Sequence, residues 1–115
     1  MPFSGQYENR TTQGMDLNSF LNPHPLSTYF LKMAGDAMID AGIRPGDILA
    51  VDRSRPPADG QIVVAERDGG LLVRLFRRTA EKAVLKTCRP GRSETVPVDG
   101  ETLLWGVVSA VVRKY

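Results

Sequence analysis

The chain has 115 residues, of which 42% are apolar and 24% charged, and its formal net charge at pH 7 is +2. This length suits one domain that buries a core without a metal or disulfide, and so small a charge does not by itself indicate a nucleic-acid partner. Cys88 is the only cysteine, which excludes an intrachain disulfide, and the longest nearly apolar run, residues 103–112, is too short to span a bilayer as a helix. The N-terminal sequence lacks the apolar core of a signal peptide, so we expect a cytoplasmic protein with no membrane association.

Residues 1–22 are predicted to form a flexible N-terminal arm ahead of a β domain over residues 23–115. The stretch GQYENRTTQG within the arm is polar and offers little to bury. MDLNSFLN, residues 15–22, is compatible with one short helical turn or with a docking strip. Pro23 and Pro25 then favour an extended backbone.

The remainder of the chain is dominated by short segments with β-strand character. We expect strands over residues 27–33, 48–53, 61–67, 71–78, 82–88, 95–98 and 103–115. Asp68-Gly69 is a hairpin turn sequence, and Gly106 indicates a bulge or a close approach of two backbones. Many short strands with one short helix predict a mainly β sandwich or barrel.

The sequence KMAGDAMIDAG, residues 32–42, predicts a short helix between the first two strands. Asp36 is expected to cap its N-terminus, and Gly42 is expected to end it. Met38 and Ile39 are expected in the core. Taken alone, these eleven residues would be an ordinary capped helix.

A longer stretch, HPLSTYFLKMAGDAMIDAGIRPGDILAVDRS, resembles the UmuD/LexA family of self-cleaving SOS-response proteins, and the UmuD branch most closely. The upstream MDLNSFLNPHP, the later DGQIVVAERDGGLLVRLFRR and the closing WGVVSAVV extend the resemblance over residues 15–115. It implies a LexA/UmuD-like β-sandwich or barrel-like peptidase fold with one short helix and a flexible arm.

The resemblance also implies a serine-lysine dyad, in which a buried lysine takes the proton of the nucleophilic serine. The family's serine falls on Ala37 and its lysine falls on Arg74. Alanine has no nucleophile, and arginine, with a pKa above about 12, cannot act as a general base near neutral pH. We therefore expect a catalytically inactive pseudo-peptidase with both site positions vestigial.

Two explanations for Ala37 remain open: a natural loss of the dyad, or an engineered substitution in a self-cleaving peptidase. Arg74 argues for natural loss, because a single engineered change would suffice. Family members are cut at a Cys-Gly or Ala-Gly bond in the arm. Here the sequence has no Cys-Gly, and its Ala-Gly pairs, at 34–35 and 41–42, lie inside the family motif. With Met1 taken as the natural start, the chain resembles the processed, shortened form of UmuD.

By resemblance, the expected function is that of an SOS-response subunit in mutagenic DNA repair. Such a subunit forms a homodimer and joins a UmuC-type translesion polymerase and RecA–single-stranded DNA filaments. The first alternative is a self-cleaving serine-lysine peptidase whose active site was mutated. The second is a repressor dimerisation domain, although the arm is too short for a DNA-binding domain ahead of the fold.

Other candidate residues receive structural interpretations. His24 is expected on the surface, and Cys88 is expected to be a buried small hydrophobe. Asp36, Asp40 and Asp47 are interpreted as caps and turn residues rather than paired carboxylates. One histidine and one cysteine do not make a metal site, and we expect neither a metal nor another cofactor.

Seven basic residues fall within residues 74–92, where Glu81 is the one acid. They are Arg74, Arg77, Arg78, Lys82, Lys86, Arg89 and Arg92. Strand alternation places Arg77 on the opposite face from Arg74 and Arg78, so the run need not form one patch. It is either a solvated face or a docking surface for a polymerase subunit or nucleoprotein filament. Direct contact with DNA is not favoured.

Overall fold

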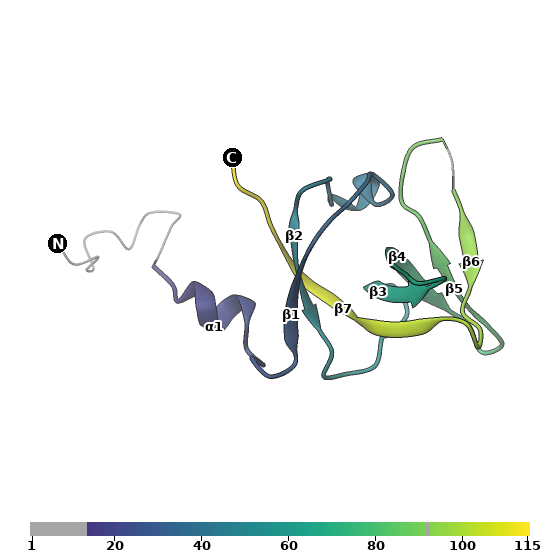
Figure 1. The fold of residues 1–115 in the computed structure, drawn as a ribbon, viewed down its shortest axis with the longest axis horizontal. Helices are drawn as coiled ribbons and strands as arrows, with labels where there is room; N and C mark the ends of the chain where they lie inside the picture. Colours follow the sequence, from purple (N-terminus) through teal and green to yellow (C-terminus); the bar gives the residue numbers. More distant parts are fainter. Residues whose placement is uncertain (1–13, 92) are drawn as a thin grey trace.

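The computed structural model describes residues 14–91 and 93–115 (Figure 1). The flexibility predicted for the arm falls mainly on residues 1–13, which lie outside the described residues. The elements in chain order are α1 (Leu17–Leu21), β1 (Thr28–Lys32), the 3-10 helix Ile39–Ala41, β2 (Ile48–Asp52), β3 (Ile62–Arg67), β4 (Gly70–Arg78), β5 (Ala83–Lys86), β6 (Thr95–Pro97) and β7 (Leu103–Val112). Neither described helix is long and apolar enough to cross a membrane.

The seven strands form one antiparallel sheet in the order β1-β2-β7-β3-β4-β5-β6. The predicted mainly β fold is therefore confirmed, and each predicted strand is present with bounds that differ by up to three residues at an end. In Figure 1, β1 and β2 run steeply across the view, whereas β3 lies nearly at right angles to them, so the sheet is strongly bent. The last strand in sequence, β7, lies between β2 and β3 and joins the two parts of the sheet.

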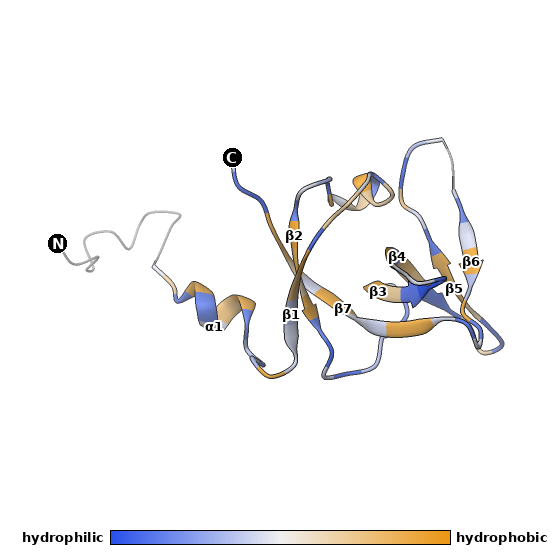
Figure 2. Cartoon of the chain, in the orientation of Figure 1, coloured by the Kyte–Doolittle hydropathy of each residue, from blue (hydrophilic) through white to orange (hydrophobic). Residues whose placement is uncertain are grey.

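Bending allows both faces of the central strands to be buried in two apolar clusters. The first cluster contains Met33, Met38, Ile43, Leu49, Val51 and Val64. The second contains Val63, Ala65, Phe76, Leu85 and Val107. Successive residues of β3 alternate between the two clusters, as side chains of a strand must. Figure 2 shows the corresponding apolar colour along β2, β3 and β7, with polar colour in most of the loops.

The β3–β4 hairpin has the turn that Asp68-Gly69 predicts. Arg67 pairs with Gly70 across the turn. Asp68 has φ 52° and Gly69 has φ 77°, so both central residues are left-handed, as a two-residue hairpin of the primed type requires. The turn fixes the register of β3 against β4 and thereby the position of Arg74 opposite Val63.

Gly106 lies where β7 passes closest to β2, as its position in the last strand predicts. A Cβ atom at this position would lie 2.7 Å from a methyl carbon of Val51 and 3.0 Å from the carbonyl oxygen of Asp52. The pairing of β7 shifts register once against β2 and once against β3. These irregularities increase strand twist and allow one strand to join the differently oriented parts of the sheet.

The helical turn predicted near residues 15–22 is present as α1. The Asp16 carboxylate caps it by accepting hydrogen bonds from the backbone N–H groups of Asn18 and Ser19, at 3.1 and 3.5 Å. None of the α1 residues is buried. Figure 1 shows α1 standing to one side of the sheet.

The helix predicted over residues 36–42 is only partly correct. The 3-10 helix begins after Met38, and Asp36 does not cap it through its side chain. Met38 is fully buried, and its non-helical backbone, at φ −123° and ψ 25°, delays the helix start. Gly42 does end the helix, with φ 84°, as predicted.

Candidate functional site

Ala37 lies in the turn that connects β1 to the 3-10 helix. Its side chain is half-buried and packs against the first cluster. The Ala37 carbonyl accepts a hydrogen bond from the Cys88 N–H at 2.8 Å, and the Asp40 N–H donates to the Cys88 carbonyl at 2.8 Å. These two bonds fasten the turn to the segment that follows β5, so position 37 is held in place from both sides.

Arg74 lies on β4 and is half-buried. Its Nη1 donates to the carbonyl of Val73 at 2.8 Å. Burial lowers the pKa of Arg74 from its ordinary value, Glu94 acts to raise it, and the nearby positive charge of Arg89 acts to lower it. A guanidinium remains protonated at neutral pH even so, and Arg74 therefore cannot accept a proton from a nucleophile.

Arg89 forms ion pairs near position 37. Its guanidinium lies 3.2 Å from the carboxylate of Asp36, the residue before Ala37, and 3.7 Å from that of Glu94. The charges of Arg89 and Glu94 also influence the pKa of Arg74. No hydrogen bond joins Ala37 directly to Arg74 among the described residues.

The side chain of residue 37 is a methyl group and that of residue 74 is a guanidinium, so neither supplies a nucleophile or a base at neutral pH. Cys88, whose backbone is hydrogen-bonded to the Ala37 turn, packs against the first cluster as expected of a small hydrophobe, although it is only partly buried. Burial raises the pKa of the Cys88 thiol, and the negative charge of Asp40 raises it further. The reactive thiolate is therefore disfavoured. Within residues 14–91 and 93–115, no group of three or more His, Cys, Asp or Glu residues could hold a metal ion.

The structure also defines residues that sequence patterns did not single out. Arg89 appears in the sequence only as one member of a basic run, and its contact with Asp36 spans 53 positions. Asp47 accepts a hydrogen bond from the Arg44 N–H at 2.8 Å, as its predicted turn role requires. It also forms an ion pair with Arg113 at 2.6 Å that no local pattern indicated. His24 is exposed, as expected.

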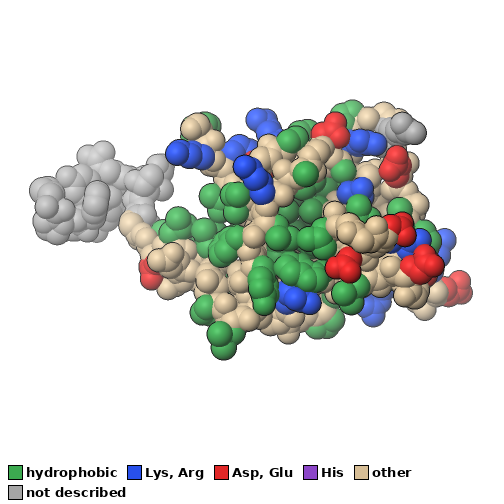
Figure 3. Space-filling view, viewed as in Figure 1, with side chains coloured by type: hydrophobic (Ala, Val, Ile, Leu, Met, Phe, Trp, Pro, Cys, Tyr) green, Lys and Arg blue, Asp and Glu red, His purple; other side chains and the backbone are tan. Residues whose placement is uncertain are grey.

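A broad apolar area is exposed at the β1 end of the sheet (Figure 3). The exposed apolar residues of β1 and β7 are Tyr29, Phe30, Val111 and Val112, each at least 36% exposed, and strand alternation places Tyr29 and Val111 on one face and Phe30 and Val112 on the other. The Arg53 guanidinium stacks 4.4 Å from the ring centre of Trp105, whose ring lies 5.3 Å from that of Tyr29. Arginine and aromatic side chains are enriched in protein–protein interfaces.

The single antiparallel sheet with one short α-helix agrees with the fold that the sequence resemblance implies. The sequence model of the peptidase S24-like family matches residues 3–107, and the chain belongs to this family. The resemblance to UmuD and LexA proteins is thereby confirmed.

Individual relatives agree with this assignment. The chain is 33% identical to protein SamA of Salmonella typhimurium over 104 residues, which cover 90% of this chain and 72% of SamA. It is 45% identical to protein ImpA of Escherichia coli over 62 residues, covering 54% of this chain and 43% of ImpA. It is 36% identical to LexA repressor 1 of Xanthomonas campestris over 87 residues, covering 75% of this chain and 43% of that repressor. The chain thus matches less than half the length of ImpA and LexA.

Proposed function

We propose that this protein is a catalytically inactive, UmuD-like subunit of the SOS response that acts in mutagenic DNA repair in the cytoplasm. The observation that carries the proposal is the joint replacement of both dyad positions, by Ala37 and Arg74, in a chain of the S24-like family. The Ala37 turn is held by hydrogen bonds to Cys88 although residue 37 has no nucleophile. An ordered turn without a nucleophile supports a protein that retains the fold for its binding surfaces. Residues 1–22 would serve as an arm and residues 23–115 as the β body.

The proposed partners are a second copy of the chain, a UmuC-type translesion polymerase and RecA–single-stranded DNA filaments. Family resemblance supplies these identities. The exposed apolar area on β1 and β7 supports protein partners in general, because such areas on soluble domains commonly mark interaction sites. Analytical ultracentrifugation at micromolar concentration is expected to give a dimer, and a result with monomer only would contradict that part of the proposal.

Self-cleavage is the direct test of inactivity. The protein is incubated with activated RecA–single-stranded DNA filaments, and separately at alkaline pH, and its mass is followed by mass spectrometry. We expect the intact mass throughout, since position 37 has no nucleophile and position 74 has no base. Appearance of a specific cleavage product would refute the proposal.

The double variant Ala37→Ser/Arg74→Lys separates natural loss from a recently mutated peptidase. It is supplied with a peptide that contains the Ala-Gly or Cys-Gly bond of a family arm. After long-standing loss we expect no cleavage, because residues around positions 37 and 74 would no longer be under selection for the reaction. Cleavage by the double variant would favour the alternative, an intact peptidase site with two substitutions.

A further inference from the structure

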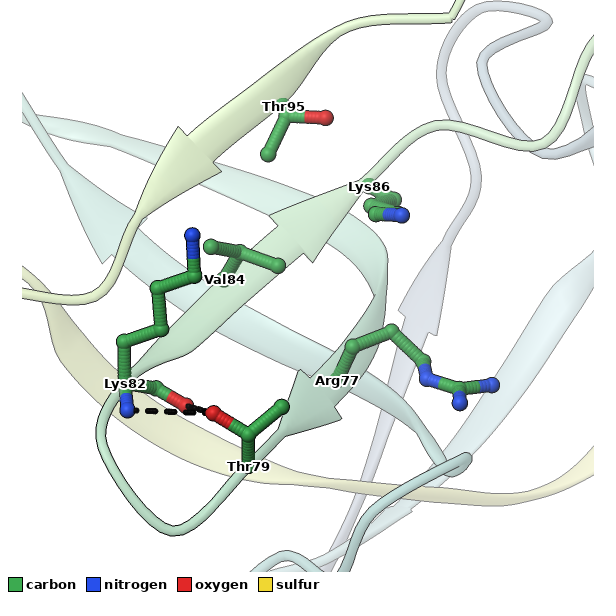
Figure 4. Close-up of a pocket in the computed structure, with 6 residues that line it drawn as sticks. All are labelled: Arg77, Thr79, Lys82, Val84, Lys86 and Thr95. Atoms are coloured by element: carbon green, nitrogen blue, oxygen red, sulfur yellow. Dashed lines mark hydrogen bonds between the residues drawn. The ribbon is translucent and has the colours of Figure 1, made fainter.

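A pocket of about 340 Å³ lies over β4, β5 and β6, on a part of the molecule that the vestigial site does not use (Figure 4). Its lining residues are Arg77, Thr79, Lys82, Val84, Lys86 and Thr95. The sheet register explains how they meet, because Arg77 pairs with Val84 and Lys86 pairs with Thr95. Three members of the basic run thus line one pocket, which the sequence pattern alone did not require.

The positive charge of the pocket is only partly compensated. Arg77 forms an ion pair with Asp59 at 3.2 Å, in which both side chains are about half exposed. Lys82 and Lys86 form no ion pair with any described residue. Figure 4 shows the Lys82 side chain extending past Val84, while the Arg77 guanidinium points away from Val84. Exposed ion pairs are weak, so an incoming anion can compete with Asp59 for the Arg77 guanidinium.

The chemistry of the lining favours phosphate over an acidic peptide segment. Lysine, arginine and threonine are the side chains that commonly contact nucleic-acid phosphates. Peptide surfaces instead rely on aromatic or large apolar anchors, and Val84 is the one apolar side chain in this pocket. The pocket has no aromatic ring on which a base could stack. The pocket would therefore contact the phosphate backbone of a nucleic acid, and binding would be independent of the base sequence.

The spacing of the cations suits a polymeric ligand. Arg77 and Lys86 are diagonal neighbours on β4 and β5, and such neighbours lie about 7–8 Å apart. Their long side chains can diverge to separate phosphate groups. We propose that this pocket binds the phosphodiester backbone of a nucleic acid. This inference does not depend on the loss of peptidase activity or on the proposed partners.

Fluorescence anisotropy with a labelled oligothymidylate, and with a duplex of the same length, tests the proposal. Three phosphate contacts predict a slope of log K against log salt of about −2 for the single strand and about −3 for the duplex. The variant Lys82→Gln/Lys86→Gln is expected to reduce the slope by about 1 to 2 and to bind several-fold more weakly. Binding of either nucleic acid with this pattern supports the shared phosphodiester chemistry.

A matched control removes two exposed lysines elsewhere. The variant Lys32→Gln/Lys114→Gln has the same net charge, and both of its sites lie outside the pocket. We expect its affinity to stay within about twofold of the natural protein, because screening limits the influence of distant exposed charges. As a readout that needs no variant, NMR shifts on adding oligothymidylate should centre on Val84 and Thr95.

Three results would overturn the proposal. The first is the absence of binding to both nucleic acids at low salt. The second is an equal loss of affinity in the two double variants, which would indicate attraction by net charge alone. The third is displacement of the oligonucleotide by polyglutamate as readily as by unlabelled oligothymidylate, which would assign the pocket to an acidic protein segment.

Discussion

At the scale of single residues, the shortest ion pair within the described part of the chain joins the turn before β2 to the segment after β7. Asp47 is 2% exposed, and its carboxylate accepts hydrogen bonds from Nε and Nη2 of Arg113 at 2.8 and 2.6 Å. The same guanidinium donates to the Gly42 carbonyl at 2.8 Å. The Arg113 hydrogen bond is the main reason that the pKa of Asp47 falls to about 2, and the backbone bond from Arg44 adds to it.

This contact predicts a specific loss of stability in acid. Because the pKa of Asp47 is lowered in the folded state, its stabilising effect is fully present above 3.8 and is lost as the pH falls from 3.8 through about 2. Urea unfolding at pH 7 should show that Asp47→Asn is less stable than the natural protein, and unfolding between pH 3.8 and about 2 should show that its stability depends less steeply on pH. Asp40→Asn, the same change at an exposed carboxylate, should keep the natural slope. An unchanged slope in Asp47→Asn would contradict the assigned role.

Motif matching proposes Ala37 and Arg74 as the dyad positions, because both stand within short stretches that resemble the family, and this assignment stays a prediction. It could not locate Arg89 or Arg113 as structural partners. Each forms its contact across more than fifty positions, with Asp36 and Asp47 respectively. Such pairings are set by how the sheet folds, and no local spacing records them.

At the scale of elements, the sequence predicts the β3–β4 hairpin correctly, whereas it predicts the start of the 3-10 helix poorly. Asp68-Gly69 specified its turn because both positions need left-handed backbone, which few residues adopt. The sequence predicts a helix that begins at Asp36, but the helix begins only after Met38, because the buried Met38 has a non-helical backbone conformation.

The hairpin turn can be tested with two neighbouring glycines. Gly69 has φ 77°, so Gly69→Ala should destabilise the protein by about 1 kcal/mol. Gly70 does not have a positive φ, and an added Cβ there would make only ordinary contact with the Arg67 carbonyl at 3.9 Å. Gly70→Ala should therefore cost clearly less. Thermal unfolding of the two variants measures the difference, and equal losses would argue against the turn geometry.

At the scale of the whole molecule, the sequence predicted the strands but not their order. Nothing in residues 103–115 indicates that β7 inserts between β2 and β3, since β2 and β3 are as apolar as β7 and could equally occupy the centre. The bent sheet likewise depends on two register shifts in β7 that only pairing reveals. Gly106 was the one local sign that β7 closely approaches another strand.

The junction at Gly106 should therefore control global stability. Gly106→Ala places a methyl group against Val51 and Asp52, and overpacking of this kind costs about 1–3 kcal/mol. Gly100→Ala is the matched control, because a Cβ at position 100 would meet no atom within 4 Å. Chemical denaturation should show a large loss for the first variant and little change for the second. If Gly106→Ala were as stable as its control, β2 and β7 would have to shift apart at little cost to accept the methyl group.

The central place of β7 has a consequence for the order of folding. The strands β1–β2 and the strands β3–β6 are each consecutive in the sequence, and each group presents an unpaired edge, on β2 and on β3, where β7 inserts. Until residues 103–112 pair with both edges, these edges are available to strands of other chains. An intermediate in which β7 has not yet inserted is therefore the species most exposed to edge-to-edge aggregation.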